Sequence, residues 1–148
     1  MEDKCFYSTK VEWTGARHGS LKSDSLPTLQ VDAPPEFKGN EGMWTPEHLF
    51  VGAISSCFMT TFVAIAENSK LDFESLKISA DGTLEKVDGV GFMITQIVLR
   101  PALTVNDAGA TARAVRILEK AEKYCLISNS AKTEIRVEPE IKVAALAA

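Results

Sequence analysis

Residues 45–66 read TPEHLFVGAISSCFMTTFVAIA, and this stretch decides the fold. It predicts a long helix that begins at Thr45, whose hydroxyl can accept a hydrogen bond from a free amide of the first turn. Pro46 suits the first helical position, where its missing N–H costs nothing, and Glu47 places a negative charge near the positive end of the helix dipole. No charged residue follows as far as Ala66. A helix that is apolar on nearly all sides is normally buried, so we expect this one at the centre of the protein.

A transmembrane span is the alternative for the same stretch, because about 18 uncharged residues can cross a bilayer. Small and hydroxylated residues interrupt the apolar run and weaken that interpretation: Gly52, Ser55, Ser56, Thr60 and Thr61. The rest of the chain alternates like a soluble sheet protein. We therefore expect a protein without a membrane partner.

Composition points to an ordinary globular protein. The 148 residues suit one domain, 1–148, with a substantial core. The net charge of −4 gives no indication of general nucleic-acid binding. No basic-then-apolar signal segment opens the chain, so the expected location is cytoplasmic. Three widely spaced cysteines and two histidines match neither a disulfide framework nor a metal site, and we expect no metal.

The segments around the long helix predict an α+β fold with mostly antiparallel strands. Strands are expected over 5–13 (half-buried), 21–25, 28–32, 74–84, 92–100 and 133–143, with Pro101 ending the fifth. Asn106 or Asp107 is expected to cap a second, amphipathic helix that runs to about Tyr124. Its predicted buried face consists of Ala110, Ala114, Ile117, Leu118 and Ala121.

Two thiols stand at noteworthy positions in this pattern. Cys57 lies in the middle of the long helix, and Cys125 lies where the second helix ends. From spacing alone, both are most simply packing residues, because free cysteine is among the most buried residue types. Cys5 is interpreted as a strand residue without a chemical role.

Three motifs together resemble the OsmC/Ohr family of osmotically induced and organic hydroperoxide resistance proteins. The first is Thr-Pro-Glu-His-Leu-Phe over 45–50 followed by Ala-Ile-Ser-Ser-Cys-Phe over 53–58; the second is Cys-Leu-Ile-Ser-Asn over 125–129. The third, Trp-Thr-Gly-Ala-Arg-His-Gly over 13–19, is similar to the family's N-terminal segment. The chain departs from the family at Thr45, where members commonly have Asn, and at Leu126, where they commonly have Pro.

The resemblance implies a thiol peroxidase that reduces organic hydroperoxides. It implies that Cys57 is the peroxidatic thiol, Cys125 the resolving thiol, Arg17 the cation that stabilises the thiolate and Glu47 the carboxylate that positions Arg17. The implied fold is an intertwined homodimer with the two buried helices at its centre. No cofactor is implied beyond an external dithiol reductant, such as a lipoyl or thioredoxin-type donor.

The chemistry of the residues agrees with these roles. The thiolate is the nucleophilic form of cysteine, and apolar neighbours such as Ile54 disfavour a charged group. The helix dipole acts within the first turn and gives Cys57 little help. A cation is therefore needed, and Arg17 in a glycine-flanked turn is a candidate. Simpler interpretations stay open: Arg17 as an exposed turn residue, and Glu47 as a carboxylate that only supports its helix.

Four large apolar residues are candidates for contacts with an organic peroxide: Phe37, Met43, Trp44 and Phe58. They are equally suitable as core residues. Two further functions also remain open, a family member that binds a hydrophobic ligand with little turnover, and a structural protein with inert thiols.

Overall fold

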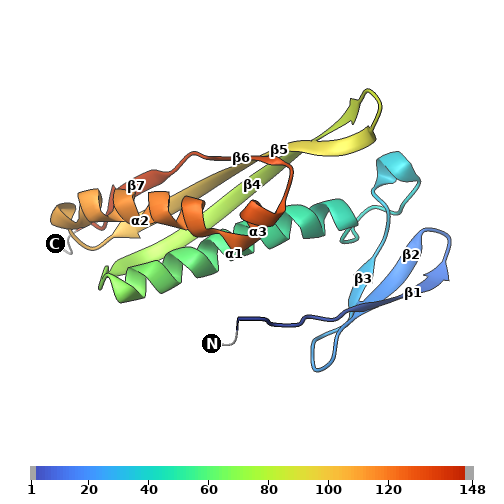
Figure 1. Ribbon diagram of the computed structural model, residues 1–148, viewed down its shortest axis with the longest axis horizontal. Helices are drawn as coiled ribbons and strands as arrows, with labels where there is room; N and C mark the ends of the chain where they lie inside the picture. Colours follow the sequence, from blue (N-terminus) through green and yellow to red (C-terminus); the bar gives the residue numbers. More distant parts are fainter. Residues whose placement is uncertain (1–2, 146–148) are drawn as a thin grey trace. The chain divides into compact units, whose positions relative to one another are not determined.

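The computed structural model describes residues 3–145, and the chain divides into two compact units, Met1–Phe50 and Val51–Ala148 (Figure 1). The division falls within the long helix α1, Pro46–Asn68. The elements follow the predicted order of three strands, long helix, two strands, amphipathic helix and closing strand. The α+β class is confirmed. The expectation of one domain over 1–148 stays a prediction.

The first unit contains a three-stranded antiparallel sheet in the order β1-β2-β3, formed by Lys10–Gly15, His18–Lys22 and Leu29–Val31. The prediction of a half-buried strand over 5–13 is wrong, because β1 begins at Lys10 and exposes Val11 (65%) and Trp13 (75%). Alternation identifies the two faces of a strand but not whether anything covers them. The second strand also begins earlier than expected, because the turn before it has only two residues, Ala16 and Arg17.

A loop connects this sheet to α1 and contains the short 3-10 helix η1, Pro35–Phe37. Gly39 is required in this loop, since a Cβ there would lie 1.5 Å from the Ala33 carbonyl oxygen. The helix start agrees with the prediction. The Thr45 hydroxyl accepts a hydrogen bond from the His48 amide at 3.1 Å, and the Thr45 carbonyl accepts one from Leu49 at 2.9 Å.

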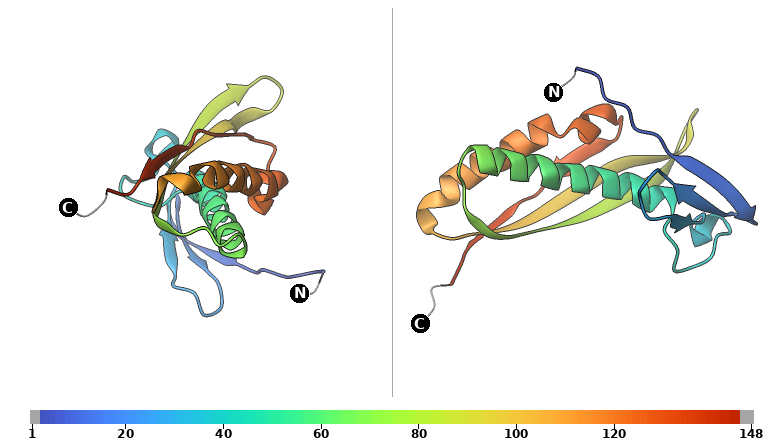
Figure 2. Two further views of the ribbon diagram at one scale, coloured as in Figure 1. Left: turned by 90° about the vertical axis from the view of Figure 1, so that its left-hand side faces the viewer. Right: turned by 90° about the horizontal axis from the view of Figure 1, so that it is seen from below.

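In the second unit, the helices and the sheet form two layers (Figures 1 and 2). The sheet contains β4, Phe73–Val87, paired antiparallel with β5, Gly91–Val105, and the later strands β6, Glu134–Val137, and β7, Glu140–Val143. Between β5 and β6 lie the 3-10 helix η2, Ala108–Ala110, and the helices α2, Thr111–Tyr124, and α3, Leu126–Ser130.

The long helix is buried on one face only, which corrects the expectation of burial on nearly all sides. Its buried side chains recur every fourth residue, at Ile54, Phe58, Phe62 and Ala66. Met59, between two of them, is 42% exposed. Within residues 3–145, α1 is the one helix long and apolar enough to cross a membrane, a criterion that core helices of soluble proteins also meet.

The second helix has the buried face that its spacing predicted, Ala114, Ile117, Leu118 and Ala121, and the predicted Ala110 is also buried but lies in η2. Asp107 provides the predicted cap, but it caps η2, where its carboxylate accepts a hydrogen bond from the Gly109 amide at 2.7 Å.

The closing segment pairs with β5 in parallel, as two short strands instead of one. The break between β6 and β7 is at Glu138–Pro139. The prediction that Pro101 ends its strand is wrong, because β5 continues through Pro101 to Val105, and the break explains why. The Leu99 carbonyl faces this edge, because it accepts a hydrogen bond from the Glu138 amide at 2.8 Å. Residues two apart in a strand face the same edge. The missing N–H of Pro101 therefore faces the break, where no ladder hydrogen bond is lost.

Candidate functional site

The two thiols predicted to react are neighbours in the second unit. Cys57 lies on α1, three residues after the buried Ile54, and Cys125 lies at the junction of α2 and α3. The Cys125 sulfur approaches the Ile54 carbonyl oxygen at 3.9 Å, and Cys57 is near enough to raise the pKa of the Cys125 thiol. Packing of α2 beside α1 thus brings together residues far apart in the sequence.

Cys125 is held in a closed environment. Its side chain is 0% exposed, and the Ser128 hydroxyl donates a hydrogen bond to its sulfur at 3.2 Å. Burial raises the pKa of the Cys125 thiol, hydrogen bonds from Ser128 act in the opposite direction, and the neighbouring Cys57 raises the pKa further. The net effect is a raised pKa, so Cys125 is a protonated thiol at neutral pH.

Cys57 is half-buried, so a small molecule can reach it more readily than Cys125. Its sulfur lies 3.9 Å from the Thr61 hydroxyl, one helical turn further on. The pair thus combines a partly open sulfur with a closed, protonated one. Such a pair places a reachable thiol beside a second thiol that is enclosed.

The predicted charged residues, Arg17 and Glu47, both belong to the first unit. Arg17 is exposed at the β1–β2 turn and makes no hydrogen bond or ion pair with other residues of the described range 3–145. One carboxylate oxygen of Glu47, Oε2, is buried and has no hydrogen-bond partner within that range. A buried carboxylate oxygen normally has a partner, and a guanidinium group would suit it.

A polar cluster lies beside Arg17 in the same unit, around the buried Asp32 (2% exposed). The Asp32 carboxylate accepts hydrogen bonds from the Ala33 amide at 2.8 Å, the Asn40 amide at 3.3 Å and the Asn40 side chain at 3.0 Å. His18 Nδ1 lies 3.8 Å from the same carboxylate. Burial acts to raise the pKa of Asp32, but the hydrogen bonds from Asn40 and Ala33 and the charge of His18 outweigh it, so the pKa lies below its ordinary value.

This lowered pKa predicts acid sensitivity of the first unit. A carboxylate with a lowered folded-state pKa contributes stability that is present above the unfolded-state pKa and is lost as the pH falls through the folded-state pKa. We expect Asp32→Asn to lower the unfolding midpoint at pH 7, and the difference from wild type to shrink below about pH 4. Tryptophan fluorescence is the appropriate measurement, because both tryptophans, Trp13 and Trp44, lie in this unit.

The matched control is Asp24→Asn, which changes an exposed carboxylate of the same unit. It should leave the midpoint unchanged at both ends of the pH range. A constant difference between Asp32→Asn and wild type from pH 7 to pH 3 would contradict the assignment.

The four apolar candidates are not alike. Phe37 and Met43 are half-buried and Trp44 is 53% exposed, all in the loop before α1. Phe58 is 1% exposed and belongs to the core of the second unit. It lines a cavity of about 270 Å³ with Leu99, Glu122, Ser128, Asn129, Thr133, Ile135 and Val137. Contact of these four residues with a peroxide stays a prediction.

Sequence reasoning missed two parts of this arrangement. Ser128 stands three residues after Cys125, a helical spacing that places both side chains on one side of a turn. This spacing could have predicted the hydrogen bond from Ser128 to the sulfur. Asp32 gave no such signal, because its side-chain partners, His18 and Asn40, come from other segments. Among residues 3–145, no group of three or more His, Cys, Asp and Glu side chains is placed to hold a metal ion.

Comparison with known proteins gives consistent results. The family model described as "OsmC-like protein" matches residues 39–140. The uncharacterized protein YmaD of Bacillus subtilis is 30% identical over 97% of each chain. The peroxiredoxin OsmC of Escherichia coli is 31% identical over 72% of each chain, and the organic hydroperoxide resistance protein-like 2 of Staphylococcus saprophyticus is 29% identical over 95% of this chain and 98% of its own.

Solved structures share the fold as well. An OsmC-like protein of unknown function from Vibrio cholerae has a TM-score of 0.85 and 25% identity, and the match covers 93% of this chain and all of that protein. Because the family model matches residues 39–140 and a relative is 30% identical over nearly the whole chain, the chain belongs to the OsmC-like protein family.

Proposed function

We propose that this protein is a thiol-dependent peroxidase that reduces organic hydroperoxides. The observation that carries the proposal is the pairing of the half-buried Cys57 with the fully buried Cys125, which lies near enough for Cys57 to affect its pKa. Membership of a family that includes proteins named for peroxiredoxin activity and organic hydroperoxide resistance supports the same conclusion.

The proposed reaction has three steps. The Cys57 thiolate attacks the O–O bond of the hydroperoxide; a proton is taken up, the alcohol leaves and Cys57 becomes a sulfenic acid. The Cys125 thiol then condenses with the sulfenic acid, which forms the Cys57–Cys125 disulfide and releases water. An external dithiol reduces this disulfide by exchange and is itself oxidised to a disulfide. The cycle needs a reducing compartment and no further cofactor, so we place it in the cytoplasm.

The test of this function is a count of free thiols. All three cysteines are unpaired in the structure. One equivalent of tert-butyl hydroperoxide should remove two thiols per chain, leave Cys5 free and release one equivalent of alcohol, without crosslinking chains. A protein that only binds hydrophobic ligands, or whose thiols are inert, would keep all three thiols, and that outcome would refute the proposal.

Arg17 is proposed to stabilise the Cys57 thiolate. An opposite charge within about 4–6 Å typically lowers the pKa of an acidic group by about 1–3. We therefore expect Arg17→Ala to slow alkylation of Cys57 by iodoacetamide at pH 7 by about tenfold or more, with little change at pH 10. Arg17→Lys, which keeps the charge but loses the planar fork, should recover part of the rate. An unchanged pH profile would show that another group stabilises the thiolate.

The functional form is proposed to be a homodimer. Within the second unit, α1 leaves Met59 exposed, and within the first unit β1 leaves Val11 and Trp13 exposed. Apolar surface of this kind is suited to contact with another protein chain, and a second copy is the partner that the family resemblance implies.

The proposed dimer also explains how Glu47 contributes. The helix is continuous over Pro46–Asn68, so ten residues between Glu47 and Cys57 correspond to about 15 Å along its axis. One chain's Glu47 is thus too distant to hold an arginine against its own Cys57. Two antiparallel copies of α1 bring the start of each helix near the middle of the other. We propose that Glu47 acts on the Cys57 of the partner, through an Arg17 from either chain.

Mixed dimers of Cys57→Ser and Glu47→Ala chains test the shared site. Each parent dimer should be nearly inactive, while a mixed dimer retains one intact site and about half of the wild-type activity. Subunit exchange must be verified, for example with differently tagged chains. If verified mixed dimers are no more active than the parents, Glu47 does not act across the dimer.

A further inference from the structure

The turn that carries Arg17 has an unusual backbone. Ala16 and Arg17 form a two-residue tip between the paired residues Gly15 and His18. Gly15 has φ 138°, and Ala16 has φ 45°, in the left-handed region that residues with a Cβ adopt only when their surroundings hold them there. The tip therefore needs contacts beyond the strand ladder to keep one conformation.

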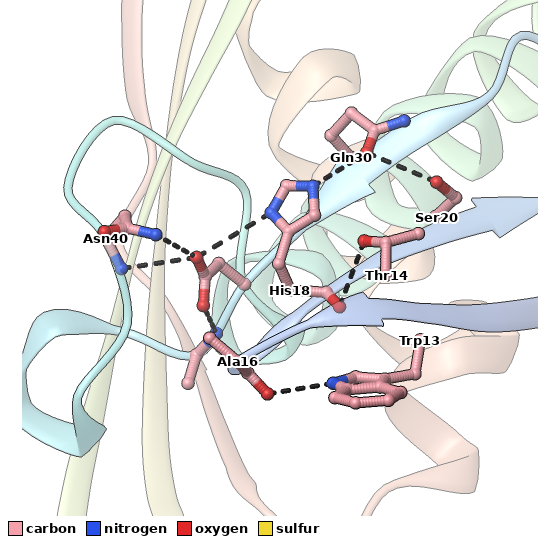
Figure 3. A network of polar contacts seen from close by, with 9 residues as sticks. Trp13, Thr14, Ala16, His18, Ser20, Gln30 and Asn40 are labelled. Atoms are coloured by element: carbon pink, nitrogen blue, oxygen red, sulfur yellow. Dashed lines mark hydrogen bonds and ion pairs between the residues drawn. The ribbon is translucent and has the colours of Figure 1, made fainter.

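Two side chains supply such contacts, one on each side of Arg17. The Trp13 indole N–H donates a hydrogen bond to the Ala16 carbonyl at 2.9 Å, and the Thr14 hydroxyl donates one to the His18 carbonyl at 3.3 Å (Figure 3). The Trp13 residue is 75% exposed within the chain, so its ring gains little from burial there. The contact that Trp13 makes in the structure is therefore its hydrogen bond to the turn.

The residue after Arg17 is anchored as well. The His18 ring lies between two partners, with Nε2 at 2.9 Å from the Gln30 side-chain oxygen and Nδ1 at 3.8 Å from the Asp32 carboxylate (Figure 3). The Ser20 hydroxyl donates a further bond to the same Gln30 oxygen at 3.3 Å. Strands β2 and β3 and the residue Asp32 that follows β3 thus meet at this ring or beside it.

The Asp32 cluster extends the anchor to the start of α1. The Asp32 amide donates a hydrogen bond to the Trp44 carbonyl at 2.9 Å, directly before the cap residue Thr45. The Asp32 carboxylate holds Asn40, whose loop position depends on the adjacent Gly39. Arg17 and Glu47 therefore belong to segments that are tied together within one unit.

We propose that Trp13, Thr14, His18 and Asp32 are positioning residues for Arg17: they fix the turn so that its guanidinium is presented in one orientation, in register with Glu47. This inference rests on the proposed role of Arg17 at the Cys57 thiolate. It assigns a purpose to an exposed tryptophan, a strained alanine and a buried carboxylate that the reaction itself does not use.

A double-mutant cycle tests the proposal. Trp13→Phe keeps an aromatic ring without the N–H, and Thr14→Val keeps the shape without the hydroxyl. Each should slow alkylation of Cys57 at pH 7 by about fivefold, the order expected for one hydrogen bond, and should have little effect at pH 10. In the Arg17→Ala background the same substitutions should cause no further loss, because residues that act through one group are not additive.

Controls separate positioning from general destabilisation. Thr83→Val changes an exposed strand threonine of the second unit and should leave the alkylation profile unchanged. Circular dichroism and the unfolding midpoint should verify that the Trp13 and Thr14 variants are folded. Asp32→Asn, measured at a temperature well below its unfolding midpoint, should show the same slowing of Cys57 alkylation at pH 7 as Trp13→Phe.

The outcomes are distinct. Equal losses with and without Arg17, or no loss in either background, would overturn the positioning role. An Arg17→Ala variant with a wild-type profile would also overturn it, while the peroxidase proposal would survive through Cys57 and Cys125. A wild-type protein that consumes no hydroperoxide would refute the proposed function, and the alkylation cycle would still decide whether the turn acts through Arg17.

Discussion

Replacing Cys57 by serine should abolish the consumption of organic hydroperoxide. A serine hydroxyl occupies nearly the same space but does not provide the thiolate that attacks the O–O bond. Removal of a nucleophile typically lowers turnover by several powers of ten, so we expect a loss of at least about 10³-fold, down to the background rate. The measurement is peroxide consumption with tert-butyl hydroperoxide and excess dithiol, followed by a peroxide-specific dye.

The matched control is Cys5→Ser, which removes the exposed thiol of the first unit. It should retain wild-type turnover and leave the number of thiols lost per equivalent of peroxide at two. Retention of wild-type turnover by Cys57→Ser would sink the peroxidase assignment. A loss in Cys5→Ser as large as in Cys57→Ser would show that the reactive pair has been assigned to the wrong thiols.

Replacing Cys125 by serine should allow one turnover and then stop the cycle. The first equivalent of peroxide still yields alcohol and a sulfenic acid at Cys57, but no second thiol lies beside it to form the protective disulfide. Under excess peroxide the sulfenic acid proceeds to sulfinic and sulfonic acids, which dithiols do not reverse. Mass spectrometry should find Cys57 with two or three added oxygen atoms, while wild-type protein under the same conditions carries the disulfide.

A sulfenic-acid trap gives the complementary result. Dimedone should label Cys57 in the Cys125→Ser variant after one equivalent of peroxide and should label wild-type protein far less. Ser128→Ala is a useful companion, because it removes the hydrogen bond to the Cys125 sulfur and leaves both thiols in place. Continued cycling by Cys125→Ser at the wild-type rate would refute the resolving role.

The parts of the fold that the sequence predicts well are those fixed by neighbours along the chain. The start of α1 follows from the cap at Thr45 and from Pro46, both local effects. The buried face of α2 follows from a strong contrast between its apolar and charged sides. The positions of the two thiols follow from these two helices.

The predictions that were wrong, and the cluster that was missed, share a different cause. Each depends on residues that lie close in space but far apart in the sequence. Pro101 stays within β5 because the facing strand is broken at that point, and the break comes from a distant proline, Pro139. The alternation around β1 predicted a half-buried strand, but the residues from Lys10 to Thr14 are all exposed. The Asp32 cluster joins residues from two strands and a loop, so no single window of sequence reveals it.

The parallel pairing of the last strands with β5 also governs the order in which the second unit can be completed. The β4–β5 hairpin closes over a short turn and can form as soon as both strands exist. Among the described residues, the other edge of β5 pairs with β6 and β7, which follow β5 only after the intervening helices. On the ribosome this edge stays open until residues 134–143 have been synthesised, and an open edge invites pairing with other chains. A nascent or truncated chain that lacks residues 134–143 therefore depends on chaperones or on rapid degradation to avoid aggregation.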